Sequence, residues 1–190
     1  MFINLLKSKL IILITSAIVL SVASCTTHVI EDPPATVAHV DIGRYLGTWY
    51  EIAHIPNRFQ KNCTQNTMAE YQPVESGRIA VLNRCTRGDG TVEQADGIAR
   101  IVDPDSNSRL KVSFVRIFGI NLFWGDYWIL GLDPEYNYAV VGAPDRKYAW
   151  VLSRTPALSA AEMVHVWSIV EEQGYDPEDF TLTRQVAESR

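Results

Sequence analysis

Short apolar segments alternate with short turn-forming runs along most of the chain. From Trp49 onward, segments rich in β-branched and aromatic residues are separated by turn signals at 75–77, 88–90, 103–108, 133–134 and 143–145. Such regular spacing is typical of an antiparallel barrel or sandwich. We predict eight strands, at residues 47–55, 65–73, 78–86, 91–102, 108–116, 125–132, 137–143 and 147–154.

Alternation within the strands predicts which side chains point into a barrel. Lys111 and Ser113 should face water. The residues that alternate with them, Leu110, Val112 and Phe114, should therefore point inward. The same argument, applied to two other strands, gives inward residues that are mostly small: Thr67, Ala69, Tyr71, Ala95, Gly97, Ala99 and Ile101.

Small inward residues favour a hollow barrel. Eight strands enclose a space that side chains can fill or that can hold one small ligand. Rings from the opposite wall that fill the space are the alternative. The candidate cavity residues, each of which could instead be plain core, are Ala69, Ala99, Phe114, Tyr127, Ile129 and Trp150.

One helix follows the last barrel strand. Ser159 and Glu162 have the spacing of a capping box, and Gly174 is a typical helix end, so we predict a helix over 159–173. Its apolar face, with Met163 and Trp167, should pack on the outside of the barrel. A short final strand is predicted at 180–183.

The N-terminus has the layout of an export signal. Lys7 and Lys9 precede an apolar run over 10–20. Residues 22–25, Val-Ala-Ser-Cys, resemble the bacterial lipoprotein box, in which the cysteine becomes lipid-modified after cleavage. The resemblance implies a signal peptide over 1–24, a lipidated Cys25 and an extended tether over 25–40. An ordinary cleaved signal or an uncleaved anchor is the alternative.

The residue that follows the cysteine indicates a destination. By resemblance to bacterial lipoproteins, Thr26 rather than Asp at this position implies transfer to the outer membrane of a Gram-negative bacterium. The lipid-anchored domain, over 41–190, would then face the periplasm.

Composition narrows the class of protein. Hydrophobic residues make up 47% and charged residues 21%, which excludes a disordered chain. The net charge of −5 and the absence of a basic cluster argue against nucleic-acid binding.

Two cysteines remain besides Cys25. Cys63 and Cys85 should lie nearly opposite each other across a hairpin that turns near 74–77, and an exported compartment would oxidise them to a disulfide. Two free thiols are the alternative. The scattered histidines and cysteines lack the spacing of a metal site.

The chain contains none of the common catalytic motifs. There is no G-x-S-x-G, H-E-x-x-H or C-x-x-C sequence, so we expect no catalytic residues, no enzymatic activity and no cofactor. His54 lies out of phase with Trp49 and should face away from the interior, so it is not a candidate haem ligand.

Three motifs indicate a family. Gly47-Thr48-Trp49-Tyr50-Glu51 resembles the G-x-W signature that opens the first strand of lipocalins. Asp133 to Tyr136 resembles their second motif, with Pro and Glu inserted, and Arg154 stands where the family has a basic residue. The resemblance implies that Gly47, Trp49, Asp133, Tyr136 and Arg154 meet at the closed end of an eight-stranded antiparallel up-and-down barrel, with Arg154 packed on Trp49 as a structural contact.

The resemblance is closest to the outer-membrane lipoprotein branch of lipocalins, related to apolipoprotein D and plant temperature-induced lipocalins, and spans about residues 41–184. It implies binding of fatty acids or lysophospholipids in membrane maintenance or stress. A structural or interaction lipoprotein with a filled barrel and no small ligand is the alternative.

The segment over 117–124 is unusually apolar for a loop. It should lie at the end of the barrel opposite the motifs. Arg116 beside it could attract a carboxylate or phosphate or be a solvated rim charge. We expect a lipid portal, a membrane-touching edge, a homodimer contact or a lid folded over the barrel, and the sequence does not separate these four.

Overall fold

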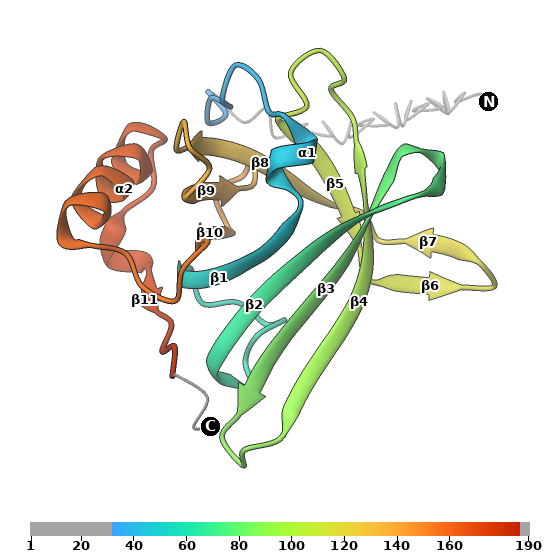
Figure 1. The fold of residues 1–190 in the computed structure, drawn as a ribbon, viewed down its shortest axis with the longest axis horizontal. Helices are drawn as coiled ribbons and strands as arrows, with labels where there is room; N and C mark the ends of the chain where they lie inside the picture. The colour runs from blue at the N-terminus through green and yellow to red at the C-terminus, as the bar shows by residue number, and fades with distance from the viewer. Residues whose placement is uncertain (1–31, 187–190) are drawn as a thin grey trace, which may run out of the picture.

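The computed structural model of the protein describes residues 32–186. The predicted signal peptide and Cys25 lie outside the described residues. Within them, eight antiparallel strands form a closed barrel with a helix outside it, which confirms the predicted fold (Figure 1). The barrel strands are β1 (Gly47–His54), β2 (Cys63–Val74), β3 (Arg78–Arg87), β4 (Val92–Ile101), β5 (Arg109–Ser113), β8 (Gly125–Leu132), β9 (Tyr138–Gly142) and β10 (Ala149–Ser153).

Each barrel strand pairs with the next one along the chain, and β1 closes the barrel by pairing with both β2 and β10. The register places Trp49 opposite Ala69 and Tyr71 opposite Val81. The β2–β3 turn contains the 3-10 turn η1 (Glu75–Gly77). The observed strand bounds fall within two residues of the predicted ones except at β5.

The strand predicted over 108–116 ends early. β5 stops at Ser113, and the chain then forms a separate two-stranded hairpin of β6 (Val115–Ile117) and β7 (Ile120–Leu122). Ser113 is buried rather than facing water, because its hydroxyl donates hydrogen bonds to the carbonyls of Val115 and Leu122. This hairpin anchor was not predicted from the alternation.

The hairpin extends sideways from the barrel and does not cover it (Figure 1). The interpretation of 117–124 as a folded-down lid is therefore wrong. The side chain of Phe118 at the turn is fully exposed, and Ile117, Ile120 and Phe123 are also exposed.

The segment before β1 covers one end of the barrel and closes it. Val37 donates its N–H to the carbonyl of Ile129, and Val40 donates to that of Ser106. The short helix α1 (Ile42–Tyr45) follows, with Asp41 as its N-cap. Val37 and Val40 thus contact the barrel although they fall in the range 25–40 that was predicted as an extended tether.

The helix α2 (Ala160–Glu172) lies outside the barrel, where its buried residues Val166 and Val170 pack beside β8 and β9 (Figure 1). The predicted capping box is present: Ser159 donates its N–H to the Glu162 carboxylate, and Glu162 donates its N–H to the Ser159 hydroxyl. Met163 and Trp167 pack against the same apolar cluster, as predicted. No helix among residues 32–186 is long and apolar enough to span a bilayer.

The C-terminal segment fills a gap in the barrel wall. After the 3-10 turn η2 (Pro177–Asp179), β11 (Thr181–Leu182) pairs with the end of β1. Arg184 then accepts a hydrogen bond from the N–H of Asn66 on β2. β1 itself pairs with β2 only over its first half, so this segment joins the two strands where they diverge.

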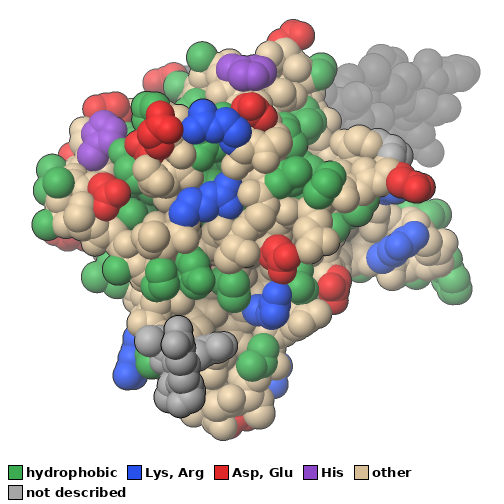
Figure 2. All heavy atoms as spheres, in the orientation of Figure 1, with side chains coloured by type: hydrophobic (Ala, Val, Ile, Leu, Met, Phe, Trp, Pro, Cys, Tyr) green, Lys and Arg blue, Asp and Glu red, His purple; other side chains and the backbone are tan. Residues whose placement is uncertain are grey.

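The surface carries charges of both signs. On the face shown in Figure 2, Lys and Arg side chains are interspersed with Asp and Glu, and no large region of one sign is present there. This face has no basic patch of the kind that tracks a phosphate backbone.

Candidate functional site: the barrel cavity

The barrel encloses a cavity of about 960 Å³. Five of the six predicted cavity residues line it: Ala69, Ala99, Phe114, Tyr127 and Trp150. Ile129 does not, although it points inward on the same face of β8 as Tyr127. It is fully buried in the core near the closed end, where its carbonyl accepts the bond from Val37, so its placement in the cavity wall was wrong.

Most of the middle of the wall is apolar. Leu110 and Val112 of β5 and Ile79 and Val81 of β3 line the cavity together with the small residues Ala69 and Ala99. A Cβ atom on Gly97 would lie 2.7 Å from the Phe114 ring, so the absence of a side chain there makes room for this ring. A wall of this kind suits an apolar ligand.

The closed end is built on Trp49. Its ring nitrogen donates to the carbonyl of Tyr45 at 2.8 Å, and the guanidinium carbon of Arg154 lies 3.8 Å from its ring centroid. Arg154 also donates to the carbonyls of Thr48 and Arg44. Gly47 has φ +91°, a conformation that favours glycine, next to the same guanidinium.

The second motif lies at the same end. The carboxylate of Asp133 accepts from the N–H groups of Glu135 and Asn137 and so shapes the β8–β9 turn. The hydroxyl of Tyr136 accepts from the N–H of Asp41, beside α1. The structure therefore brings all three sequence motifs together at the closed end of the barrel.

Three tyrosines line the deep part of the cavity. The hydroxyl of Tyr127 lies 2.8 Å from that of Tyr45 and 2.9 Å from that of Tyr71. Burial raises the pKa of Tyr71 to about 12 and raises the pKa values of Tyr45 and Tyr127 well above their ordinary range. All three phenols are therefore protonated and neutral at physiological pH.

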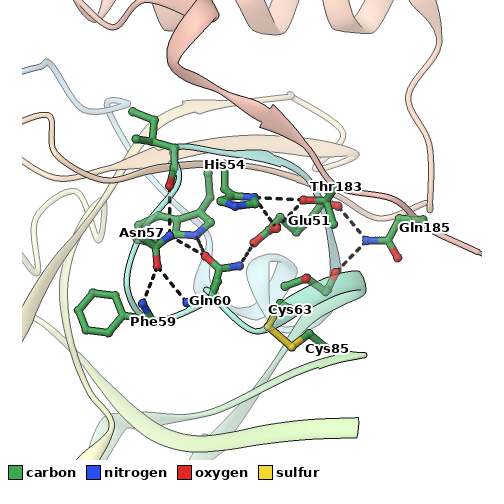
Figure 3. A network of polar contacts seen from close by, with 12 residues as sticks. Glu51, His54, Asn57, Phe59, Gln60, Cys63, Cys85, Thr183 and Gln185 are labelled. Carbon is green, nitrogen blue, oxygen red and sulfur yellow. Dashed lines mark hydrogen bonds and ion pairs between the residues drawn. A yellow bond between two sulfur atoms is a disulfide. The ribbon is translucent and has the colours of Figure 1, made fainter. Parts of the chain in front are cut away.

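A polar network braces the mouth side of β1 (Figure 3). The buried carboxylate of Glu51 accepts hydrogen bonds of 2.5 Å from both Gln60 and Thr183, and the Nδ1 atom of His54 lies 2.9 Å from it. Gln185 adds a bond from its side chain to the carbonyl of Glu51. The network joins β1, the 55–62 loop and the C-terminal segment.

Glu51 was not among the predicted site residues. It lies two residues from Trp49 on the same face of β1, and this spacing was the available signal that it points inward. It also lines the cavity. His54 does not line the cavity; it points toward Glu51 and Thr183.

The predicted disulfide joins Cys63 and Cys85, with their Cα atoms 5.5 Å apart. Register shifts near the start of β2 place Cys63 opposite Arg87, so the bridge runs diagonally across the hairpin. Both cysteines line the cavity, and Figure 3 shows the bond between their sulfur atoms. Among residues 32–186, no group of three or more His, Cys, Asp or Glu is placed to hold a metal ion.

Comparison with known proteins identifies the family. A model of the lipocalin-like domain matches residues 40–185. The chain belongs to the lipocalin family.

Several lipocalins are similar over most of this chain. The outer membrane lipoprotein Blc of Escherichia coli is 35% identical over 165 residues, which cover 86% of this chain and 90% of that protein. Temperature-induced lipocalin-1 of Arabidopsis thaliana is 38% identical and covers 74% and 76%. Apolipoprotein D of Mus musculus is 34% identical and covers 80% of each chain.

Solved structures agree in fold. Insecticyanin from the tobacco hornworm Manduca sexta superposes with a TM-score of 0.64 at 24% identity, over 82% of this chain and 85% of that one. The family and fold together indicate a barrel that binds a small lipophilic ligand.

Proposed function

We propose that this lipocalin binds a fatty acid or a lysophospholipid in the barrel cavity, for lipid storage or transport in membrane maintenance. The observation that supports this function is the cavity itself: about 960 Å³ of space, with an apolar middle between Ala69, Ala99 and Phe114. This volume is in the usual range of ligand sites. It argues against the filled-barrel alternative.

The proposed location is the outer membrane of a Gram-negative bacterium, on its periplasmic face. Support comes from the lipoprotein box at Cys25 and from the similarity to relatives named outer membrane lipoproteins, in Escherichia coli and Vibrio cholerae. Two or three acyl chains on Cys25 would anchor the barrel stably.

The β6–β7 hairpin is the proposed contact with the bilayer. Phe118 and Ile120 at its tip are exposed, and Phe123 beside it lines the cavity, so the hairpin connects the surface to the ligand site. A homodimer through 117–124 is the alternative, and sedimentation of the lipid-free protein distinguishes them: a monomer favours the bilayer contact.

Native mass spectrometry of a soluble form, residues 26–190, tests ligand binding. This form contains every described strand and helix. We expect a one-to-one adduct of a fatty acid or lysophospholipid, weakened by Trp150→Ala. Trp128→Ala is the matched control, since Trp128 packs on the outer side of the wall, in the cluster under α2. An adduct-free mass that does not change after either lipid is added would overturn the proposal.

A further inference from the structure

The three deep tyrosines have three hydroxyl protons but only two hydrogen bonds in which to use them, within the described part of the chain. Each phenol supplies one donor. The two bonds in the chain, Tyr45 to Tyr127 and Tyr127 to Tyr71, use two of the three protons. Among residues 32–186, the structure shows no other hydrogen bond to these hydroxyls, so one proton has no protein acceptor whichever direction the chain takes.

The spare proton is a buried one. Tyr45 and Tyr71 are 4% and 7% exposed, and both line the cavity. A buried donor without an acceptor is unfavourable, so an acceptor supplied from the cavity would stabilise the protein–ligand complex. The high pKa values of all three phenols keep the proton in place at neutral pH.

Several polar groups near the cavity are already engaged. Arg84, which lines the cavity and pairs with Glu70, is an exception, because its buried Nε atom has no hydrogen-bond partner among the described residues. Arg154, whose charge is closest to the tyrosines, is directed at Trp49 and at two backbone carbonyls. Glu51 and Gln60, nearer the mouth, bond to each other. The tyrosine hydroxyls are therefore a polar group available at the deep end of the pocket.

We propose that the Tyr45–Tyr127–Tyr71 hydroxyl chain binds a neutral oxygen acceptor at the inner end of the ligand, so that the ligand enters oxygen-first. This inference rests on the proposed function, because it assumes that the barrel takes an apolar ligand. The class of ligand is an unbranched chain that ends in a hydroxyl or carbonyl group, including a fatty acid in its protonated form.

A neutral group fits this site better than an anion. One spare donor matches one acceptor, whereas a carboxylate buried here would lose its hydration without a cation directed at it. A lysophospholipid is too polar at its head to enter in this direction. It would enter methyl-first and leave the spare proton without an acceptor.

The test compares two ligands of similar length, 1-decanol and n-undecane, which differ at one end by a hydroxyl against a methyl group. Each competes with the fluorescent apolar probe N-phenyl-1-naphthylamine for residues 26–190. The variant replaces all three tyrosines, Tyr45→Phe, Tyr71→Phe and Tyr127→Phe, because removal of one hydroxyl still leaves a spare proton. Replacement of all partners by rings of the same shape leaves no unpaired group.

We expect 1-decanol to bind the triple variant about 5-fold more weakly than the wild type, the effect of one hydrogen bond. The affinity for n-undecane should change little. Tyr148→Phe, which removes a hydroxyl near the mouth, is the control and should change neither. Equal affinities of both ligands for wild type and triple variant would overturn this inference alone, whereas failure of probe and ligands to bind the wild type would overturn the proposed function.

A spectroscopic measurement on the wild type covers the case in which the triple variant does not fold. Bound 2-undecanone should show its carbonyl stretching band at lower frequency than the same ketone in hexane, because a phenol donates to it. A band at the hexane position would show that the carbonyl does not reach the tyrosines and would overturn the inference.

Discussion

The guanidinium of Arg154, just past the last barrel strand, lies 3.8 Å from the ring centroid of Trp49, near the start of the first. The same side chain donates two hydrogen bonds to carbonyls of Thr48 and Arg44. The contact joins both ends of the barrel wall at the closed end. It is a cation–π contact with a fully buried ring.

Arg154→Gln should lower the free energy of unfolding by about 2–3 kcal/mol, because it removes the cation–π contact and two charge-assisted bonds. Arg154→Lys should lower it less, since a charge remains but the planar fork is lost. Urea unfolding followed by tryptophan fluorescence measures both. Arg109→Gln is the control: Arg109 is exposed over Trp128, so a loss as large as that of Arg154→Gln would contradict this account.

The Cys63–Cys85 disulfide should contribute about 3 kcal/mol to stability, because it closes a loop between residues 22 apart. Cys63→Ala with Cys85→Ala should lower the urea midpoint accordingly. Reductant should lower the midpoint of the wild type to a similar value and leave the double variant unchanged. A wild-type midpoint that is insensitive to reductant under unfolding conditions would contradict the prediction.

Alkaline pH should destabilise the barrel. The pKa of Tyr71 is raised by burial from 10.0 to about 12, and burial also raises the pKa of Tyr175 to about 12. The folded state holds these protons more tightly than the unfolded state, so the stabilisation is fully present below pH 10 and is lost as the pH rises toward 12. For the fully buried Tyr71 this shift corresponds to about 3 kcal/mol.

Free energies of unfolding measured across this range, together with phenolate absorbance, check the alkaline prediction. Tyr71→Phe should flatten the pH dependence, because it removes one of the phenols whose pKa burial raises. A stability that stays level through the range, or rises, would show that burial does not hold these phenols protonated.

Glu51→Gln should loosen the C-terminal segment. The carboxylate accepts from Gln60, from Thr183 and, at 2.9 Å, from the His54 ring. The side-chain amide of the variant has an NH₂ group in place of one carboxylate oxygen, and this group would point at one of those donors. We expect a loss of about 2 kcal/mol and faster hydrogen exchange of the amides at 181–186. Glu70→Gln, at a partly exposed ion pair with Arg84, is the control and should leave this exchange unchanged.

Much of the barrel could be predicted from local patterns. Strand alternation and turn residues placed the strands, and the capping box at Ser159 placed the helix, because these signals depend on neighbours in the chain. The inward direction of Ala69, Ala99 and Tyr127 followed from the same alternation.

Predictions were wrong or incomplete where a residue is placed by a segment far away in the chain. Ile129 points inward as expected, but residues 36–46 fill the barrel beneath it, so it belongs to the core rather than to the cavity. Ser113 is buried because the chain turns back as a hairpin above it. Strand alternation by itself contains no information about such coverage.

The sequence alone determined the order and direction of the strands, the disulfide pair and the three motifs, since each follows from spacing along the chain. Only the tertiary structure decided where the cavity ends, the hydrogen bonds of the C-terminal segment to Glu51 and the hydrogen bonds among three tyrosine hydroxyls. Tyr45, Tyr71 and Tyr127 come from three separate elements, and closure of the barrel brings their oxygens within hydrogen-bond distance. The hydroxyl chain with one proton left over, and the ligand chemistry that this proton favours, therefore exist only in the folded protein.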